Sequence, residues 1–201
     1  NQLMTSSDAV RKRIALALSA FFVVSLTGLD FSWRSYAIAA WWDTLSANAF
    51  GNFRNLLQDV TLNPAMGYYL NTKGNLKENV ATGRAPDENY GREVMQLFTL
   101  GLYLLNTDGT EKRDGNGNKQ ETYTQSDITN IARIFTGWDF DQTQNVTTVE
   151  PVSGRTIPNT VFTRIPMRLN PANHSTLAAT FLGATVPANT DGVTALKTAL
   201  D

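Results

Sequence analysis

The chain has 201 residues, of which 42% are hydrophobic and 17% are charged, a balance that supports one folded domain and excludes a highly charged, disordered chain. Its 17 basic and 18 acidic residues nearly cancel, and the basic ones are scattered, so we expect no nucleic-acid partner. Cysteine is absent, which excludes disulfides, thiolate zinc sites and cysteine nucleophiles. The single histidine, His174, excludes any site that needs two histidines from this chain.

The first hydrophobic segment, RKRIALALSAFFVVSL at 11–26, has two interpretations. A basic start followed by an apolar run is typical of a signal peptide. However, ten residues precede it, no clear small-x-small cleavage site follows, and the run is too short to span a bilayer. Its large side chains recur at helical spacing, namely Val10, Ile14, Leu18, Phe21 and Phe22. This spacing favours a buried helix, and we expect no membrane span in the chain.

Helical patterns dominate the next sixty residues. Helices are predicted at 35–45, which is rich in aromatic residues, at 49–60 and at 64–70. The helix at 49–60 has a single apolar stripe formed by Phe50, Phe53, Leu56, Leu57 and Val60. Pro64 suits the first turn of the following helix, and residues 71–84 have the polar, glycine-containing composition of a surface loop.

The segment PDENYGREVMQLFTLG, at 86–101, combines a polar start with a clear helical pattern. Asp87 is a suitable N-cap, and Gly101 is the expected left-handed residue after the helix. The predicted core-facing stripe consists of Tyr90, Val94, Leu97 and Phe98. The segment therefore predicts one continuous α-helix with a polar outer face.

The second half contains fewer helices. The polar segment 106–123 predicts a β-hairpin or an irregular excursion around DGNG. Asp114 begins a partial calcium-loop pattern, but Lys119 replaces the required glycine, so a turn is the better interpretation. Thr124 to Asp127 predicts a capping box for the next helix, residues 139–170 lose helical periodicity, and a last helix begins near Thr190 or Asp191. The predicted fold is a single all-α or nearly all-α domain over 1–201.

Three blocks of the sequence together resemble one known family. They are WWDTLSANAFGNFRNLLQDVTLNPAMGYYL (41–70), GRAPDENYGREVMQLFTLGL (83–102) and YTQSDITNIARIFTGW (123–138). They are similar, in content and order, to the bacterial domain-of-unknown-function family 1800, as are RKRIALALSAFFVVS near the start and HSTLAATFLGATVPAN at 174–189. The resemblance covers nearly the whole chain and implies a mostly helical domain.

The resemblance also carries expectations about location and partners. It implies an exported protein, periplasmic or secreted, that is often encoded beside a second family with a sulfatase-like or phosphatase-like appearance. No established reaction comes with the family, and the cofactor stays unknown. The family usually continues beyond the last residue here, so we expect this chain to be a fragment truncated at its C-terminal end.

Two positions depart from the family pattern. Gln96 stands where the family commonly has glutamate, and His174-Ser175 stands where it tends to have His-Asp, followed by a lysine that is missing here. If the family has a carboxylate–histidine site, this chain has lost potential ligands.

The polar face of 86–101 supplies the candidate site. The candidate catalytic residues are Glu93, Arg92 and His174, and the candidate binding residues are Asn89, Gln96 and Glu88. At 100° per residue, Glu88 and Glu93 diverge by about 140° around a helix, whereas Asn89, Glu93 and Gln96 share a face. Carboxylate and amide oxygens suit a hard cation or acid–base chemistry. A capped helix with a Glu88–Arg92 surface pair explains the same residues without any chemistry.

Three functions are compatible with this sequence. The first is a structural or protein-interaction module that docks on a partner protein or an envelope component. The second is a metal-assisted, hydrolase-like domain that uses Glu93 and His174. The third is glycan binding through exposed aromatic side chains, for which the candidates are Trp33, Tyr36, Trp41, Trp42, Tyr68, Tyr69 and Trp138. We favour the interaction module because most of the motifs are apolar and periodic.

Overall fold

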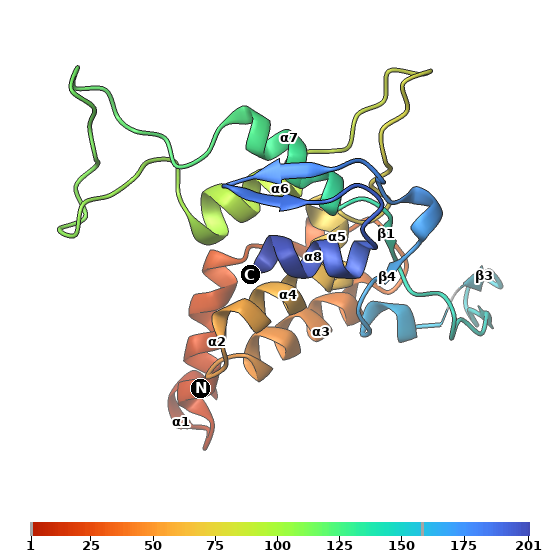
Figure 1. The fold of residues 1–201 in the computed structure, drawn as a ribbon. Helices are drawn as coiled ribbons and strands as arrows, with labels where there is room; N and C mark the ends of the chain where they lie inside the picture. Colours follow the sequence, from red (N-terminus) through yellow and green to blue (C-terminus); the bar gives the residue numbers. More distant parts are fainter. Residues whose placement is uncertain (1, 158) are drawn as a thin grey trace.

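The computed structural model describes residues 2–157 and 159–201. Helices form most of the first half of the chain: α1 (Gln2–Thr5), α2 (Ala9–Phe21), a 3₁₀ turn at Leu26–Gly28, α3 (Arg34–Ala47), α4 (Phe53–Leu62) and α5 (Pro64–Tyr69). The second half contains α6 (Asn89–Glu93), a π-helix at Val94–Thr99, α7 (Gln125–Ile134) and α8 (Gly192–Leu200). Figure 1 shows α2, α3 and α4 on one side of the molecule and α6 and α7 on the other, with α8 between them, and α5 packs against α3 and α4.

Three short antiparallel sheets accompany these helices. They are β1 (Trp138–Asp139) with β4 (Arg168–Leu169), β2 (Thr148–Val149) with β3 (Thr156–Ile157), and β5 (Ala179–Phe181) with β6 (Ala184–Val186). Two 3₁₀ turns, at Val161–Thr163 and Pro171–Asn173, lie between them. The β5–β6 hairpin packs against α7 and α8. The fold is therefore rich in helix but not all-α, because parts of the segment predicted to be irregular pair into sheets.

Local signals explain where α4, α5, α7 and α8 begin. The Asn52 side chain accepts a hydrogen bond from the Arg54 N–H, and Asn63 does the same for the Ala65 N–H just ahead of the Pro64 turn. Thr124 and Asp127 form the predicted capping box of α7. Asp191 caps α8 by accepting from the N–H groups of two following residues. Each cap satisfies donors that a helix start leaves unpaired, which contributes about 1 kcal/mol per cap.

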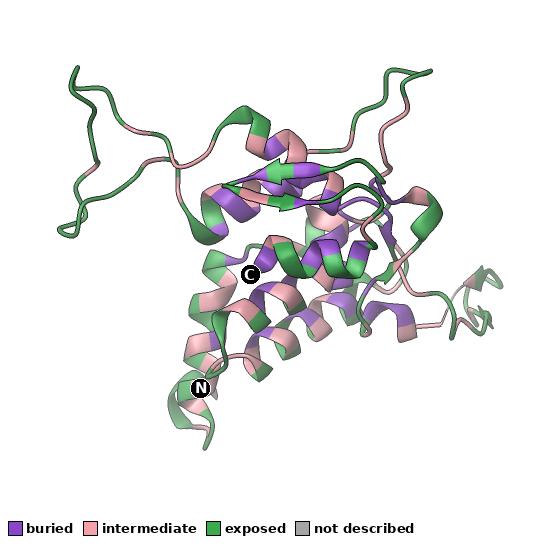
Figure 2. Cartoon of the chain, viewed as in Figure 1, coloured by how far each residue is buried: buried purple, intermediate pink, exposed green. Residues whose placement is uncertain are grey.

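An aromatic core joins the two sides of the molecule. Phe22 follows α2 and lies 4.9 Å, centroid to centroid, from Phe98 of the π-helix. Tyr90 of α6 meets Phe135 edge-on at 4.8 Å, and its hydroxyl donates to the Thr61 hydroxyl of α4 over 2.7 Å. Figure 2 shows the buried residues concentrated on the facing sides of the helices. These contacts are long-range, so they bind elements that are far apart in the chain.

Several predicted core positions lie instead at the surface. Val10 and Phe21 of α2 are exposed, and only Phe22 of that stripe is fully buried. Phe50 is exposed because α4 begins three residues later, at Phe53, which is itself exposed. Leu97 is exposed because residues 94–99 wind as a π-helix and not as an α-helix. Among residues 2–157 and 159–201, no helix combines the length and the hydrophobicity that a membrane crossing requires.

The polar segment after Gly101 forms a forked arm, defined here as residues 102–122, that projects from the body (Figure 1). Its stem pairs Tyr103 with Glu121. Beyond Leu104 the arm divides into two short turns, one closed by the Leu105–Glu111 bridge and one by the Arg113–Lys119 bridge. Asp114 organises the second turn by accepting from the N–H groups of Asn116 and Asn118. The predicted excursion is therefore present as a double hairpin.

Candidate functional site

The start of α6 is held by a network of short polar side chains. The Asn75 side chain accepts from the Asp87 N–H at 2.9 Å and donates to the Asp87 carbonyl at 3.1 Å. The Asp87 carboxylate accepts from the Asn89 N–H at 2.8 Å and from the Asn71 amide at 3.1 Å. Asp87 thus supplies the capping contact, one residue before the N-cap position, Glu88, whose own side chain makes no capping hydrogen bond. Asn89 begins α6, and its side chain is half-buried.

Glu88 joins α6 to α7. Its carboxylate accepts hydrogen bonds from the Thr129 hydroxyl at 2.7 Å and the Gln125 amide at 2.9 Å, and it pairs with Arg92 at 3.2 Å. Partial burial acts to raise the pKa of Glu88, but these hydrogen bonds and the Arg92 charge outweigh it and lower the pKa below its usual value. The carboxylate has three partners from this chain, which is the arrangement of a structural clamp between two helices.

The π-helix changes which residues lie together on the surface. Leu100 N–H donates to the Met95 carbonyl, five residues back, at 2.9 Å, and the Thr99 hydroxyl donates to the Val94 carbonyl at 2.6 Å. Because this winding takes more residues per turn than an α-helix, the face expected for Asn89, Glu93 and Gln96 is not continuous. Gln96 instead accepts a long hydrogen bond, 3.4 Å, from the Tyr123 hydroxyl.

A hollow of about 270 Å³ lies beside this contact, lined in part by Arg92, Gln96, Glu121 and Tyr123. Burial raises the pKa of Tyr123, the Arg92 charge opposes this rise, and the smaller effects of the Glu93 and Glu121 charges add to it. The Oε2 atom of Glu93 is buried and accepts no hydrogen bond from the residues that the structure describes. Arg92, Gln96 and the Glu93 charge therefore share one neighbourhood around Tyr123.

His174 belongs to a different neighbourhood, beyond the other end of α7. It is 5% exposed, and its Nδ1 atom lies 2.9 Å from the Thr136 carbonyl oxygen. A carbonyl only accepts, so Nδ1 carries the proton. The adjacent Ser175 donates its N–H to the Thr136 hydroxyl at 2.8 Å, and its own hydroxyl to the Glu78 carboxylate at 2.9 and 3.0 Å. Ser175 and His174 thus use separate acceptors and form no nucleophile–base pair.

The two neighbourhoods lie at opposite ends of α7. Arg92 contacts Gln125, the first residue of that helix, and Gln96 contacts Tyr123 just before it, whereas His174 contacts Thr136 after its end. The ten residues of α7 span about 15 Å. Within the described part of the chain, no three His, Asp or Glu side chains gather closely enough to hold a metal ion. The catalytic roles predicted for Glu93, Arg92 and His174 stay predictions, and the geometry does not unite them.

The aromatic residues predicted as a sugar platform are dispersed by the fold. Trp41 and Trp138 are buried, whereas Trp42 and Tyr36 are exposed. Trp33 and Tyr36 meet edge-on at 5.7 Å, and Tyr68 packs against Phe31 at 5.0 Å. Packing therefore uses half of the tryptophans, and the rest do not present one flat face.

A row of exposed leucines begins on the π-helix and continues into the stem of the forked arm, and the helical pattern of the sequence did not predict it. We call it the leucine run: Leu97, Leu100, Leu102, Leu104 and Leu105. Each of these side chains is between 39% and 55% exposed. The sequence pattern predicted only Leu97 of these five as a core residue, whereas the π-helix and the projecting arm leave all five exposed.

Comparison with known proteins gives one positive result. A family model described as a protein of unknown function (DUF1800) matches residues 1–201, the whole chain. The chain belongs to this family. The family block at 83–102 contains both the Glu88 clamp and the first part of the leucine run. No curated protein and no solved structure matches the chain.

Proposed function

We propose that this DUF1800 domain is a protein-interaction module that docks on a partner protein through the leucine run. The observation that carries the proposal is the exposure of five leucines within nine residues, none of which belongs to the hydrophobic core. Isolated exposed leucines are ordinary, but a continuous apolar surface on a projecting element is typical of an interface.

The free energy available from burying the leucine run suits a docking surface that is supported by neighbouring contacts. Complete burial of a leucine contributes about 1.5–3 kcal/mol relative to full exposure, so covering the exposed half of five leucines offers roughly 4–7 kcal/mol. Association itself costs at least about 4 kcal/mol, so the leucine run needs additional contacts from its surroundings. Phe21 is also exposed, and its ring lies 6.1 Å, centroid to centroid, from the buried Phe98 of the same π-helix, which makes it a nearby apolar residue that a partner can contact.

The arm offers a partner its side chains and not its backbone. Leu104 donates its N–H to the Gln120 carbonyl at 2.9 Å and accepts from the Lys112 N–H at 2.7 Å. The Leu102 carbonyl accepts from the Thr122 N–H at 3.1 Å. Because these groups are already paired, an added β-strand is not the expected mode of binding. We infer that the partner contributes an apolar groove or helix face.

The charge of the arm also favours a protein over a membrane or nucleic acid. Residues 102–122 contain three basic and four acidic side chains, and Glu111 pairs with Lys119 at 2.7 Å. A surface of this balance has no electrostatic attraction for anionic lipid or phosphate. The family resemblance supplies the partner to test, namely the sulfatase-like protein encoded beside such domains, and an exported location for both.

The experiment measures association of the purified chain with that neighbouring protein by calorimetry. Leu105→Asp and Leu100→Asp are expected to weaken binding at least tenfold, because each places an uncompensated charge in an apolar contact. Val80→Asp is the matched control, since Val80 is 95% exposed on the other projecting loop. Equal binding by all variants would remove the leucine run from the interface, and concentration-dependent self-association would replace the partner with a second copy of this chain.

A further inference from the structure

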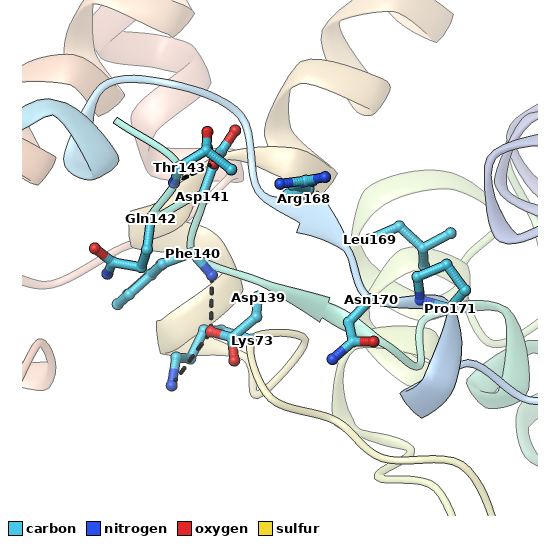
Figure 3. Close-up of a pocket in the computed structure, with 10 residues that line it drawn as sticks. All are labelled: Lys73, Asp139, Phe140, Asp141, Gln142, Thr143, Arg168, Leu169, Asn170 and Pro171. Atoms are coloured by element: carbon cyan, nitrogen blue, oxygen red, sulfur yellow. Dashed lines mark hydrogen bonds and ion pairs between the residues drawn. The ribbon is translucent and has the colours of Figure 1, made fainter. Parts of the chain in front are cut away.

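A separate hollow of about 670 Å³ lies on the far side of the body from the arm, beside the β1–β4 pair (Figure 3). Its volume falls in the range of small-molecule sites. β1 and β4 supply Asp139 and Arg168 as direct cross-strand neighbours, and the loop after α5 supplies Lys73. None of these residues belongs to the sites described above.

Arg168 is the charged group in this hollow with the most unused binding capacity. Its guanidinium makes no hydrogen bond or ion pair with the residues that the structure describes, although its charge reaches Asp141. Hydrogen bonds from Thr143, and to a smaller extent the Arg168 charge, lower the pKa of Asp141. Figure 3 shows the guanidinium at the edge of the hollow, apart from the Lys73–Asp139 contact. A free planar guanidinium is suited to bidentate binding of a carboxylate.

The carboxylates of Asp139 and Asp141 each use only one oxygen in contacts with the rest of the described chain. Asp139 Oδ1 accepts from the Phe140 N–H at 2.7 Å and faces Lys73 Nζ at 3.5 Å. Asp141 Oδ1 accepts from the N–H of Thr143 at 2.9 Å and from its hydroxyl at 2.6 Å. The Oδ2 atom of each residue accepts nothing from the described part of the chain. These oxygens repel a simple anion but are acceptors for hydroxyl groups of a ligand.

The remaining residues that line the hollow are apolar or carry hydrogen-bond donors. The Phe140 ring is fixed by Phe31 and Phe162, each 5.0 Å away between centroids, and Lys73 lies over it at 5.2 Å. Asn170 uses its carbonyl oxygen to accept from the Ala172 N–H at 3.1 Å, which leaves its amide N–H groups for a ligand. The hollow therefore combines three donor groups, on Arg168, Lys73 and Asn170, with two carboxylate oxygens that can accept from hydroxyl groups and with the edge of an aromatic ring.

We propose that this hollow binds a sugar acid, with its carboxylate on Arg168 and its hydroxyls on Asp139 and Asp141. A hydroxylated organic acid satisfies the free guanidinium and both free carboxylate oxygens at once, and its C–H face can contact Phe140. A neutral sugar leaves the guanidinium without a charged partner, and a small carboxylate leaves both aspartate oxygens unused and close to a like charge.

The test uses sodium glucuronate as the probe, with glucose and acetate as comparison ligands, in NMR titrations of the whole chain. Glucuronate is expected to bind at least tenfold more tightly than either comparison ligand and to shift the amide signals of residues 139–143 and 168–170. Arg168→Gln is expected to weaken glucuronate binding at least tenfold. Arg168→Lys is expected to bind more tightly than Arg168→Gln but less tightly than the unmodified chain, because lysine lacks the planar guanidinium that binds a carboxylate with two N–H groups. Asp141→Asn is expected to weaken glucuronate more than acetate.

Arg164→Gln provides the matched control, because Arg164 is an exposed arginine four residues earlier that hydrogen-bonds Thr160 and lines another hollow. Thermal unfolding of every variant separates loss of binding from loss of fold. Unchanged glucuronate affinity in Arg168→Gln, or equal affinity for glucuronate and glucose, overturns the proposal, as does the absence of any shift at millimolar glucuronate. Leu105→Asp should bind glucuronate as the unmodified chain does, so this result is independent of the docking surface.

Discussion

Gly137 and Gly117 have the same positive φ of 85° in very different surroundings. A Cβ added at Gly137 would lie 2.9 Å from the Asn170 carbonyl oxygen and 2.9 Å from the His174 nitrogen, both main-chain atoms. A Cβ added at Gly117, in the forked arm, would meet nothing within 4 Å. The body uses glycine to bring chain segments together, whereas the arm uses it only to turn. Stability should therefore depend on the first region, and partner contact on the second.

The largest expected effect is that of Gly137→Ala. The left-handed conformation costs a non-glycine residue about 1–2 kcal/mol, and overpacking against main-chain atoms adds roughly 1–3 kcal/mol. Gly117→Ala bears only the first cost. Urea unfolding of the two variants measures the difference, and similar losses for both would contradict the division into a packed body and an open arm.

The contacts around Thr136 extend the packed region, so Ser175→Ala should be the next most damaging change. It removes a buried hydroxyl that donates to the Glu78 carboxylate, and hydrogen bonds to charged groups contribute about 1.5–3 kcal/mol. Tyr90→Phe, which loses a hydrogen bond to Thr61 between neutral groups, should cost about 1 kcal/mol. Chemical denaturation ranks the two, and the reverse order would mean that the Ser175–Glu78 bond contributes little.

Two carboxylates with lowered pKa values, Glu88 in the body and Asp114 in the arm, extend the comparison between these two regions. The pKa of Glu88 is lower in the folded chain than its ordinary value of 4.5, so its contribution is present above that value and is lost as pH falls through the lower, folded value. The contribution is about 1 kcal/mol or less because the side chain is 30% exposed. Below pH 4.5, the unfolding free energy of the unmodified chain should fall toward that of Glu88→Gln.

Asp114 contrasts with Glu88, because its hydrogen bonds stay within one turn of the arm. The backbone N–H of Asn118, followed by its side-chain amide, lowers the pKa of Asp114, but this residue lies in an exposed turn of the arm. Asp114→Asn should speed amide exchange at residues 114–118 at neutral pH without changing the global unfolding midpoint. A shift of the whole transition would show that the arm and the body unfold as one unit.

The smallest stability effect is expected for Leu105→Asp, within about 0.5 kcal/mol, as for surface substitutions in general. Thermal unfolding measures it, with Val80→Asp as the comparison. A loss of several kcal/mol would mean that the leucine run packs against the body and is not a free surface.

Local signals in the sequence predicted much of this fold. The capping box at Thr124–Asp127, the Asp191 cap, the Pro64 turn and the left-handed Gly101 all occur as expected, because each depends on residues within one turn of the chain. The Glu88–Arg92 pair was also visible as an i, i+4 spacing. Its further partners on α7 were not, because Gln125 and Thr129 are 37 and 41 residues away.

The sequence by itself determined the family, the helical character and the starts of α5, α7 and α8, because these follow from block order, periodicity and short-range hydrogen bonds. Only the tertiary structure decided that 94–99 winds as a π-helix, that His174 and Arg92 lie at opposite ends of α7, and that β1 meets β4 to place Arg168 beside Asp139. Such features depend on contacts between residues far apart in the chain, and a periodicity of three to four residues contains no information about them.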